Sequence, residues 1–185
     1  MTQMFTHTLN PVHGGGLGPA VKTVPLAAST RANAYAGRVG YLNDNGELVV
    51  GAPSTKKAMP LFIMQGIESP SVYMDVDTSV DKAYIVTSGR VNCAVATGGW
   101  ELQTTEFVTG GGNAYPPNTP LTVHTDGKLK VGTIGTDWIV GMASLHESAP
   151  VNTAPYDSSQ RAVGLDANRQ SVLNLWTLFI PGSSS

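Results

Sequence analysis

The stretch LNDNGELVVG, residues 42–51, is typical of a β-hairpin, and a similar stretch occurs later in the chain. Its Asn-Gly pair accepts the positive φ values that a tight two-residue turn requires. The stretch TDGKLKVG, residues 125–132, repeats the pattern 81 positions later, with Asp-Gly at the turn and the same Leu-x-Val-Gly after it. The sequence therefore predicts two hairpins, whose turns are formed by Asn45, Gly46, Asp126 and Gly127.

The composition also favours β structure. Charged residues make up 13% of the 185 residues, against about 25% in ordinary globular domains. Threonine, serine and asparagine are abundant, and the chain contains 21 glycines and 12 prolines. No window is rich in the alanine, leucine, glutamate and lysine that long helices favour. We expect a mainly β protein, a compact β-barrel or sandwich of short strands and hairpins.

Each hairpin leads to an apolar segment that carries one glycine, FIMQG at 62–66 and WIVGM at 138–142. Two such successions in one small β protein indicate two equivalent corners of a barrel or sandwich. The segment 171–182, SVLNLWTLFIPG, is expected to be the closing strand, because Pro-Gly ends it and its apolar residues alternate. Trp138 and Trp176 stand in these apolar segments, so both are expected in the core.

The first 36 residues differ from the rest of the chain. They contain three prolines and a run of three glycines, without a sustained period of 2 or 3.6. A segment of this kind buries too little apolar surface to order itself. We expect an extended N-terminal arm over 1–36 that lies across a partner, or else packs on its own domain, followed by a β domain over 37–182 and a tail over 183–185. The residues expected to bind a partner are Gly14, Gly15, Gly16, Pro19 and Trp100.

Several classes of function find no support in the sequence. A net charge of −2 provides no electrostatic reason to expect nucleic acid, and no apolar run reaches the about 18 residues of a membrane span. The first residues lack the pattern of a signal peptide. The single cysteine, Cys93, excludes a disulfide framework and is expected to be a buried structural thiol. We therefore expect assembly in a reducing cytoplasm.

Catalytic and metal-binding motifs are also missing from the sequence. The four histidines have no metal-ligand spacing. The segment DVDTSVD, residues 75–81, begins like a calcium loop but lacks the glycine and the glutamate that such a loop needs. The segment GGGLGPAVKT, residues 14–23, lacks the glycine before the lysine of a phosphate loop. We expect neither a catalytic residue nor a cofactor.

A family resemblance covers residues 37–182. It is carried by AGRVGYLNDNGELVVGA, TSGRVNCAVAT, YPPNTPLTVHTDGKLKVGT, WIVGMASLHE and the terminal LNLWTLFIPG. In this order the segments resemble the small β-barrel decoration (cement) proteins that stabilise the heads of tailed bacteriophages. The long N-terminal arm and the polar segment 148–170 depart from that pattern.

The resemblance implies a structural virion protein, without catalytic activity, assembled in the host cytoplasm. It would bind the major capsid protein on the outer capsid surface and stabilise contacts between capsid subunits. It would also associate with itself, as a trimer in preference to a dimer. One alternative is a tail or fibre module that binds a host-surface glycan through Trp100 and Tyr115. Another is a hydrolase that acts through Asp75, Asp77 or Glu106.

Overall fold

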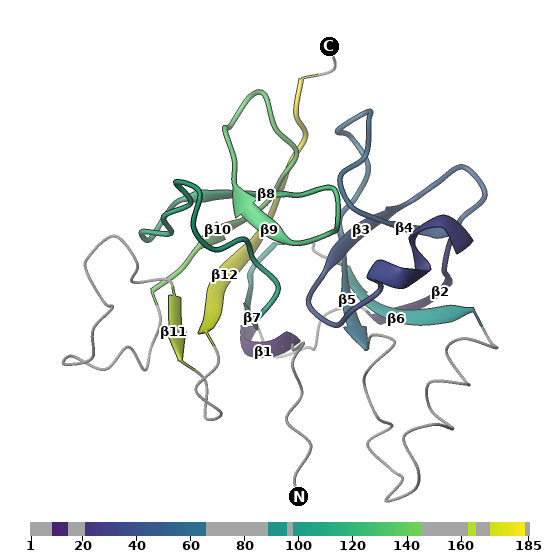
Figure 1. The fold of residues 1–185 in the computed structure, drawn as a ribbon, viewed down its shortest axis with the longest axis horizontal. Helices are drawn as coiled ribbons and strands as arrows, with labels where there is room; N and C mark the ends of the chain where they lie inside the picture. The colour runs from purple at the N-terminus through teal and green to yellow at the C-terminus, as the bar shows by residue number, and fades with distance from the viewer. Residues whose placement is uncertain are drawn as a thin grey trace, which may run out of the picture.

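The fold is described from a computed structural model. The residues that it describes are 9–14, 21–65, 89–95, 98–145, 163–165 and 171–183. Within them the protein is mainly β, with two antiparallel sheets and one short 3-10 helix, η1 (Ala28–Asn33). Figure 1 shows the two sheets side by side, with β8, β9, β10 and β12 in one and β2 to β6 in the other.

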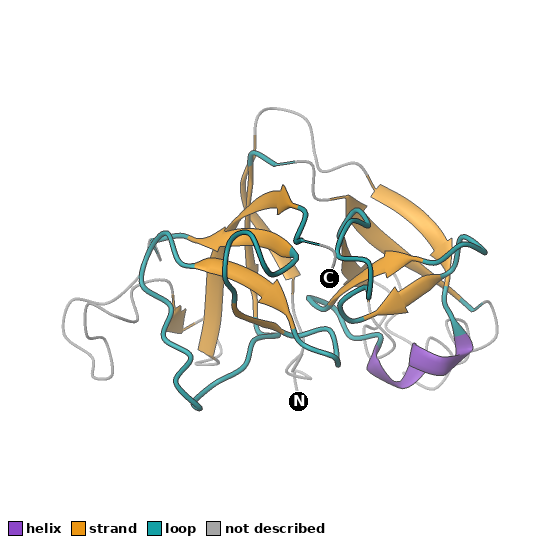
Figure 2. Ribbon diagram, turned by 90° about the horizontal axis from the view of Figure 1, so that it is seen from above, coloured by secondary structure: helices purple, strands orange, loops and turns teal. Residues whose placement is uncertain are grey.

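Both sheets are open. Sheet B has the spatial order β2 (Val21–Pro25), β6 (Arg90–Val95), β5 (Leu61–Gln65), β3 (Val39–Leu42), β4 (Leu48–Val50). Sheet A has the order β1 (Leu9–Gly14), β7 (Trp100–Thr104), β12 (Ser171–Ile180), β10 (Ile139–Ala143), β8 (Pro120–Val123), β9 (Leu129–Val131), with β11 (Val163–Leu165) paired to β12. The sheets pack against each other without closing (Figure 2). The predicted sandwich is therefore confirmed, and the barrel alternative is wrong.

The two sheets contain the same five-stranded arrangement. The order β2-β6-β5-β3-β4 of sheet B matches β7-β12-β10-β8-β9 of sheet A. Gly40 lies opposite Val50, and Leu121 lies opposite Val131, 81 positions later. The other strand pairings of sheet B recur in sheet A 80 to 82 positions further on. The described strands thus form an internal duplication. The first unit consists of β2 to β6, and the second unit consists of β7 to β10 with β12.

The duplication also includes the segments that precede each hairpin. The Gly37 N–H donates to the Ile63 carbonyl at 2.8 Å, and the Asn118 N–H donates to the Ala143 carbonyl at 2.8 Å. Gly37 and Asn118 both have positive φ, +89° and +69°. Asparagine is one of the few residues other than glycine that adopt this conformation readily. The repeated hairpin therefore belongs to a repeat that covers most of the described strands.

The turns of the two hairpins differ from the predicted two-residue form. In the first, the Gly46 N–H donates to the Asn43 carbonyl and the Asn43 N–H donates to the Glu47 carbonyl, both at 2.9 Å. This pattern closes a three-residue loop, in which a β-turn is followed by a glycine of positive φ. Gly46 has φ +75°, as predicted, whereas Asn45 does not have positive φ.

The second hairpin has the same three-residue loop. The Gly127 N–H donates to the His124 carbonyl at 3.0 Å, and the His124 N–H donates to the Lys128 carbonyl at 2.8 Å. Gly127 has φ +91°, and Asp126 before it does not have positive φ. The positive φ of both glycines is confirmed, but each loop is one residue longer than the Asn-Gly and Asp-Gly pairs indicate.

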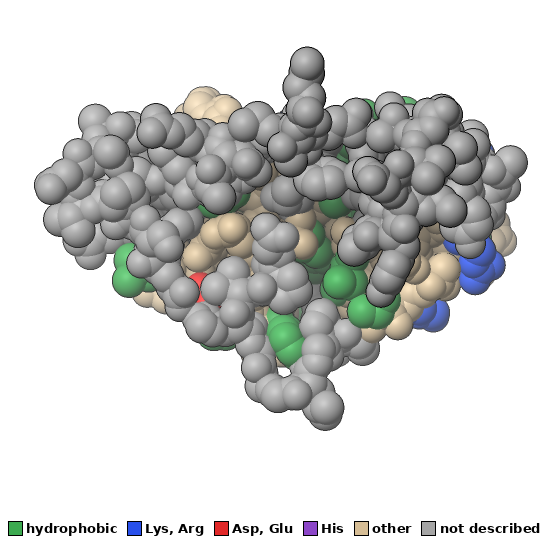
Figure 3. All heavy atoms as spheres, turned by 90° about the horizontal axis from the view of Figure 1, so that it is seen from below, with side chains coloured by type: hydrophobic (Ala, Val, Ile, Leu, Met, Phe, Trp, Pro, Cys, Tyr) green, Lys and Arg blue, Asp and Glu red, His purple; other side chains and the backbone are tan. Residues whose placement is uncertain are grey.

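Exposed charge is unevenly distributed over the face that Figure 3 shows. Lysine and arginine side chains gather there at one end, on the side of sheet B. Two exposed basic residues, Lys22 of β2 and Arg90 of β6, belong to that sheet.

Among the helices that the structure describes, none is long and apolar enough to cross a membrane.

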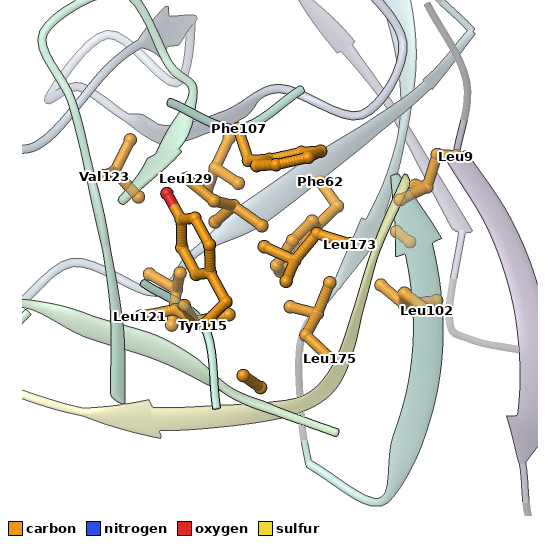
Figure 4. Close-up of a cluster of buried hydrophobic side chains, with 14 of the residues drawn as sticks. Leu9, Phe62, Leu102, Phe107, Tyr115, Leu121, Val123, Leu129, Leu173 and Leu175 are labelled. Carbon is orange, nitrogen blue, oxygen red and sulfur yellow. The ribbon is translucent and has the colours of Figure 1, made fainter. Parts of the chain in front are cut away.

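The larger core lies between the sheets and draws on both units (Figure 4). The ring of Phe107 meets that of Tyr115 edge-to-face, with centroids 5.5 Å apart. The buried members of this larger core are Leu9, Val39, Phe62, Ala94, Leu102, Phe107, Tyr115, Leu121, Val123, Leu129, Trp138, Val140, Ala143, Leu173 and Leu175. A second cluster lies under sheet B and η1, formed by Val24, Leu26, Ala34, Leu48, Val50, Leu61, Ile63, Val91 and Cys93.

The prediction of a separate arm over 1–36, set apart from a domain at 37–182, is wrong for the residues described there. Residues 9–14 form β1, which pairs with β7, and residues 21–25 form β2, which pairs with β6. Leu26 is buried in the second cluster. The prolines misled the prediction, because edge strands tolerate proline where the missing N–H faces away from the sheet.

Candidate functional site

Two of the predicted partner-binding residues, Gly14 and Trp100, lie side by side. Gly14 ends β1 and lies opposite Trp100 at the start of β7. The Trp100 side chain is half-buried and packs against the larger core. Gly15, Gly16 and Pro19 lie outside the described residues. The structure thus brings Gly14 and Trp100 together at the edge of sheet A.

The tips of the two hairpins lie in different surroundings. Asn45 and Gly46 are exposed, and a Cβ added at Gly46 would meet nothing within 4 Å. Gly127 is buried, and its carbonyl accepts a hydrogen bond from the Val39 N–H at 2.9 Å. The first tip is therefore available to a partner, whereas the second is part of the junction between the units.

Close backbone approach at this junction requires glycine on both sides. A Cβ at Gly127 would lie 2.5 Å from Cγ1 of Val50, and one at Gly51 would lie 2.6 Å from the Thr125 carbonyl oxygen. Both glycines also have positive φ. The last glycine of the first hairpin and the turn glycine of the second therefore allow the two hairpins to pack against each other.

An ion pair crosses the same junction. Nε of Arg38 donates to Oε2 of Glu106 at 2.7 Å, and both side chains are less than one tenth exposed. Nη1 of Arg38 also donates to the Asp126 carbonyl at 3.1 Å, and the guanidinium lies 4.4 Å from the ring centre of Tyr35. Arg38 comes from the first unit and Glu106 from the second. No sequence motif marks either residue, so the sequence did not predict the pair.

Asp126 is held by its own hairpin. Its Oδ1 lies 2.8 Å from Nδ1 of His124 and accepts a bond from the Lys128 N–H at 3.2 Å. Partial burial raises the pKa of Asp126, but these hydrogen bonds and the charges of Arg38 and His124 outweigh it. The pKa of the Asp126 carboxyl therefore lies below its ordinary value.

Of the two tryptophans expected in the core, only Trp138 is there. Trp138 is 1% exposed, and its Nε1 donates to the Ala58 carbonyl at 2.8 Å. Trp176 is 42% exposed. Successive side chains of a strand point to opposite faces. Since Leu173 and Leu175 point into the core, Trp176 must point out, and the prediction for it is wrong.

The tyrosine of the predicted glycan platform is not accessible. Tyr115 is 1% exposed, and its hydroxyl donates to the Val108 carbonyl at 2.6 Å. Burial raises its pKa to about 12 although this bond lowers it. Trp100 and Tyr115 therefore cannot form a stacking surface for a sugar.

Polar side chains lie on β7 and β12 around Trp176. Glu101 lies opposite Trp176 and accepts a hydrogen bond from the Ser144 hydroxyl. The Gln103 amide donates to Oδ1 of Asn174 at 3.0 Å. These groups satisfy one another, as buried polar groups must.

The residues considered for catalysis have structural surroundings where they are described. Cys93 is fully buried, and burial raises the pKa of its thiol to about 12, which confirms a structural thiol. Glu106 of the hydrolase alternative is paired with Arg38. Asp75 and Asp77, with the rest of the calcium-like segment, lie outside the described residues. Within the described part of the chain, no three His, Cys, Asp or Glu side chains converge to hold a metal ion.

Comparisons with protein families, with curated proteins and with solved structures find no match to this chain.

Proposed function

We propose that this protein is a structural component of a bacteriophage particle, which binds the outer capsid surface and stabilises contacts between major capsid protein subunits. It acts without catalysis or a cofactor. Self-association accompanies this role. The family resemblance favours a trimer, with a dimer as the alternative.

The internal duplication is the observation that supports this proposal best. Two units with the same strand order place two similar backbone frameworks on one chain. A capsid surface offers the same binding site many times. A chain with two similar units is suited to bridge two neighbouring copies, and the second contact then forms at a high effective concentration.

The glycan-binding alternative loses the surface on which it depended. Tyr115 is buried, and the exposed tryptophan is Trp176 instead of Trp100. The hydrolase alternative loses Glu106, because that carboxylate is buried against Arg38.

Binding to particles tests the proposal directly. The purified full-length chain is mixed with mature capsids of the phage that encodes it, prepared without this protein, and the capsids are sedimented. We expect saturable binding with a fixed number of copies per capsid, together with a higher temperature of capsid disruption. Absence of binding would overturn the proposal. Specific binding on a glycan array without binding to capsids would replace it by the alternative.

A further inference from the structure

The outer edge of β2 is the feature on which this inference depends. Among the described strands, β2 pairs only with β6 and forms one edge of sheet B. The equivalent strand of the second unit, β7, pairs on its outer edge with β1 in antiparallel fashion. The duplicated backbone therefore accepts an antiparallel strand at this edge in one unit, and no described strand occupies the same edge in the other.

One hydrogen bond shows which backbone groups of β2 face outward. The Leu26 N–H donates to the Gly89 carbonyl at 2.6 Å, so this pair lies at a hydrogen-bonded position beside β6. Hydrogen-bonded positions alternate along an antiparallel pair. Val24 and Lys22 therefore direct their backbone groups toward β6, where they lie opposite Val91 and Cys93.

The intervening residues then direct their backbone groups away from the sheet. Val21 and Thr23 each present an N–H and a carbonyl, whereas Pro25 presents a carbonyl only. The Thr23 carbonyl accepts one long hydrogen bond, 3.4 Å, from the Arg90 guanidinium, and a carbonyl oxygen has a second lone pair available. Val21 is 56% exposed, and Thr23 is also exposed.

We propose that this edge binds the same edge of a second copy of the chain around a two-fold axis, with Thr23 opposite Thr23. The two threonines exchange N–H to carbonyl bonds. The Val21 N–H of each copy donates to the Pro25 carbonyl of the other. This register uses every outward N–H of β2, and the absent N–H of Pro25 leaves only the Val21 carbonyls without a strand partner.

Side chains favour the same register. With Thr23 at the axis, threonine meets threonine, which is a favourable cross-strand pair, and exposed Val21 meets the uncharged Pro25. With Lys22 at the axis, two ammonium-bearing side chains would stand directly opposite at a Cα separation of about 4.5 Å, which is unfavourable. The pairing would join two five-stranded arrangements into one continuous sheet, an isologous contact of the kind that closes a dimer.

A pair of cysteine variants tests both the contact and its register. In the proposed register the two Thr23 Cα atoms lie about 5.5 Å apart, within the range of a disulfide. The two Val21 residues are separated by four positions along the strands, about 13 Å. We expect Thr23→Cys to form a reducible covalent dimer under mild oxidation. Val21→Cys and the wild-type chain, whose Cys93 is buried, should remain uncrosslinked.

Other crosslinking patterns contradict the proposal. No crosslinking of Thr23→Cys would exclude the contact. Stronger crosslinking of Val21→Cys than of Thr23→Cys would exclude this register, and equal crosslinking of both would indicate random collision.

Sedimentation velocity of the full-length chain provides a test without oxidation. Thr23→Pro removes an outward N–H and should weaken the dimer at least about tenfold, whereas Thr23→Val keeps the backbone and should not. A thermal melt shows whether Thr23→Pro is folded; if it is not, the cysteine pair decides. A wild-type chain that stays monomeric at all concentrations, or a folded Thr23→Pro chain that dimerises as the wild type does, would overturn the proposal. These measurements need no capsid, so their outcome is independent of the proposed function.

Discussion

At the scale of single residues, the same amino acid has different roles in the two units. Gly46 and Gly127 both end a three-residue loop with positive φ. The surroundings of Gly46 are open, whereas Gly127 packs against Val50 and the Val39 carbonyl. Local backbone conformation therefore requires glycine at both turns, and packing requires it at the second alone.

We predict different losses of stability when alanine replaces these glycines. Gly46→Ala should lower the free energy of unfolding by about 1–2 kcal/mol, the cost of a side chain in the left-handed region. Gly127→Ala adds a steric clash and should cost more than about 3 kcal/mol. Urea denaturation measures both, and Gly46→Ala is the matched control. Equal losses would contradict the close packing of the second tip.

At the scale of elements, the hydrophobicity of β12 does not by itself predict which of its side chains are buried. Its segment SVLNLWTLFI is apolar enough to be expected in the core on both faces. In the structure, Leu173 and Leu175 pack between the sheets. Trp176 lies on the opposite face beside Glu101, and the adjacent Asn174 bonds to Gln103 on that face.

Two tryptophan variants test this assignment. Trp138→Ala should cost roughly 3–5 kcal/mol of stability, because it empties a core position and leaves the Ala58 carbonyl without its donor. Trp176→Ala should cost no more than about 1 kcal/mol, as for a surface substitution. Iodide should quench the fluorescence of the exposed Trp176, which is the part missing from Trp176→Ala. It should not quench the fluorescence of the buried Trp138, which is the part missing from Trp138→Ala. The reverse order of stability losses would contradict the orientation of β12.

At the scale of the whole molecule, the two units are joined by a shared core and by the buried ion pair of Arg38 and Glu106. The larger cluster takes Val39 and Phe62 from the first unit and leucines of β12 from the second. Arg38 and Glu106 connect the units at the polar end of this junction. A buried pair of this kind adds little net stability compared with apolar residues in its place, but removing one partner alone strongly destabilises the fold.

We predict that Arg38→Met and Glu106→Leu each cost about 3–5 kcal/mol, because each removes the opposite charge that faces a buried charged group. The double variant should lose much less than the sum of the two. A double-mutant cycle in urea measures this coupling, with Arg90→Met, on an exposed arginine, as the control. Additive losses would show that the two side chains act independently.

Local sequence patterns were sufficient to predict the class of fold and part of the repeat. Turn glycines, short alternating segments and low charge reflect backbone preferences that act within a few residues. Gly46, Gly127, Trp138 and Cys93 were therefore predicted correctly. The length of each turn was not, because Asn-Gly and Asp-Gly also occur in three-residue loops.

Tertiary structure determined the rest, because it depends on contacts between distant segments. Residues 9–14 and 21–25 have no periodicity of their own and become strands because β7 and β6 provide their hydrogen-bond partners. The Arg38–Glu106 pair joins residues that are 68 positions apart. The outer edge of β2, which no described strand occupies, gains its meaning from comparison with β7, its equivalent in the other unit. Backbone hydrogen bonds between strands carry little trace in side-chain sequence, so the edges of a sheet emerge only when the strands assemble.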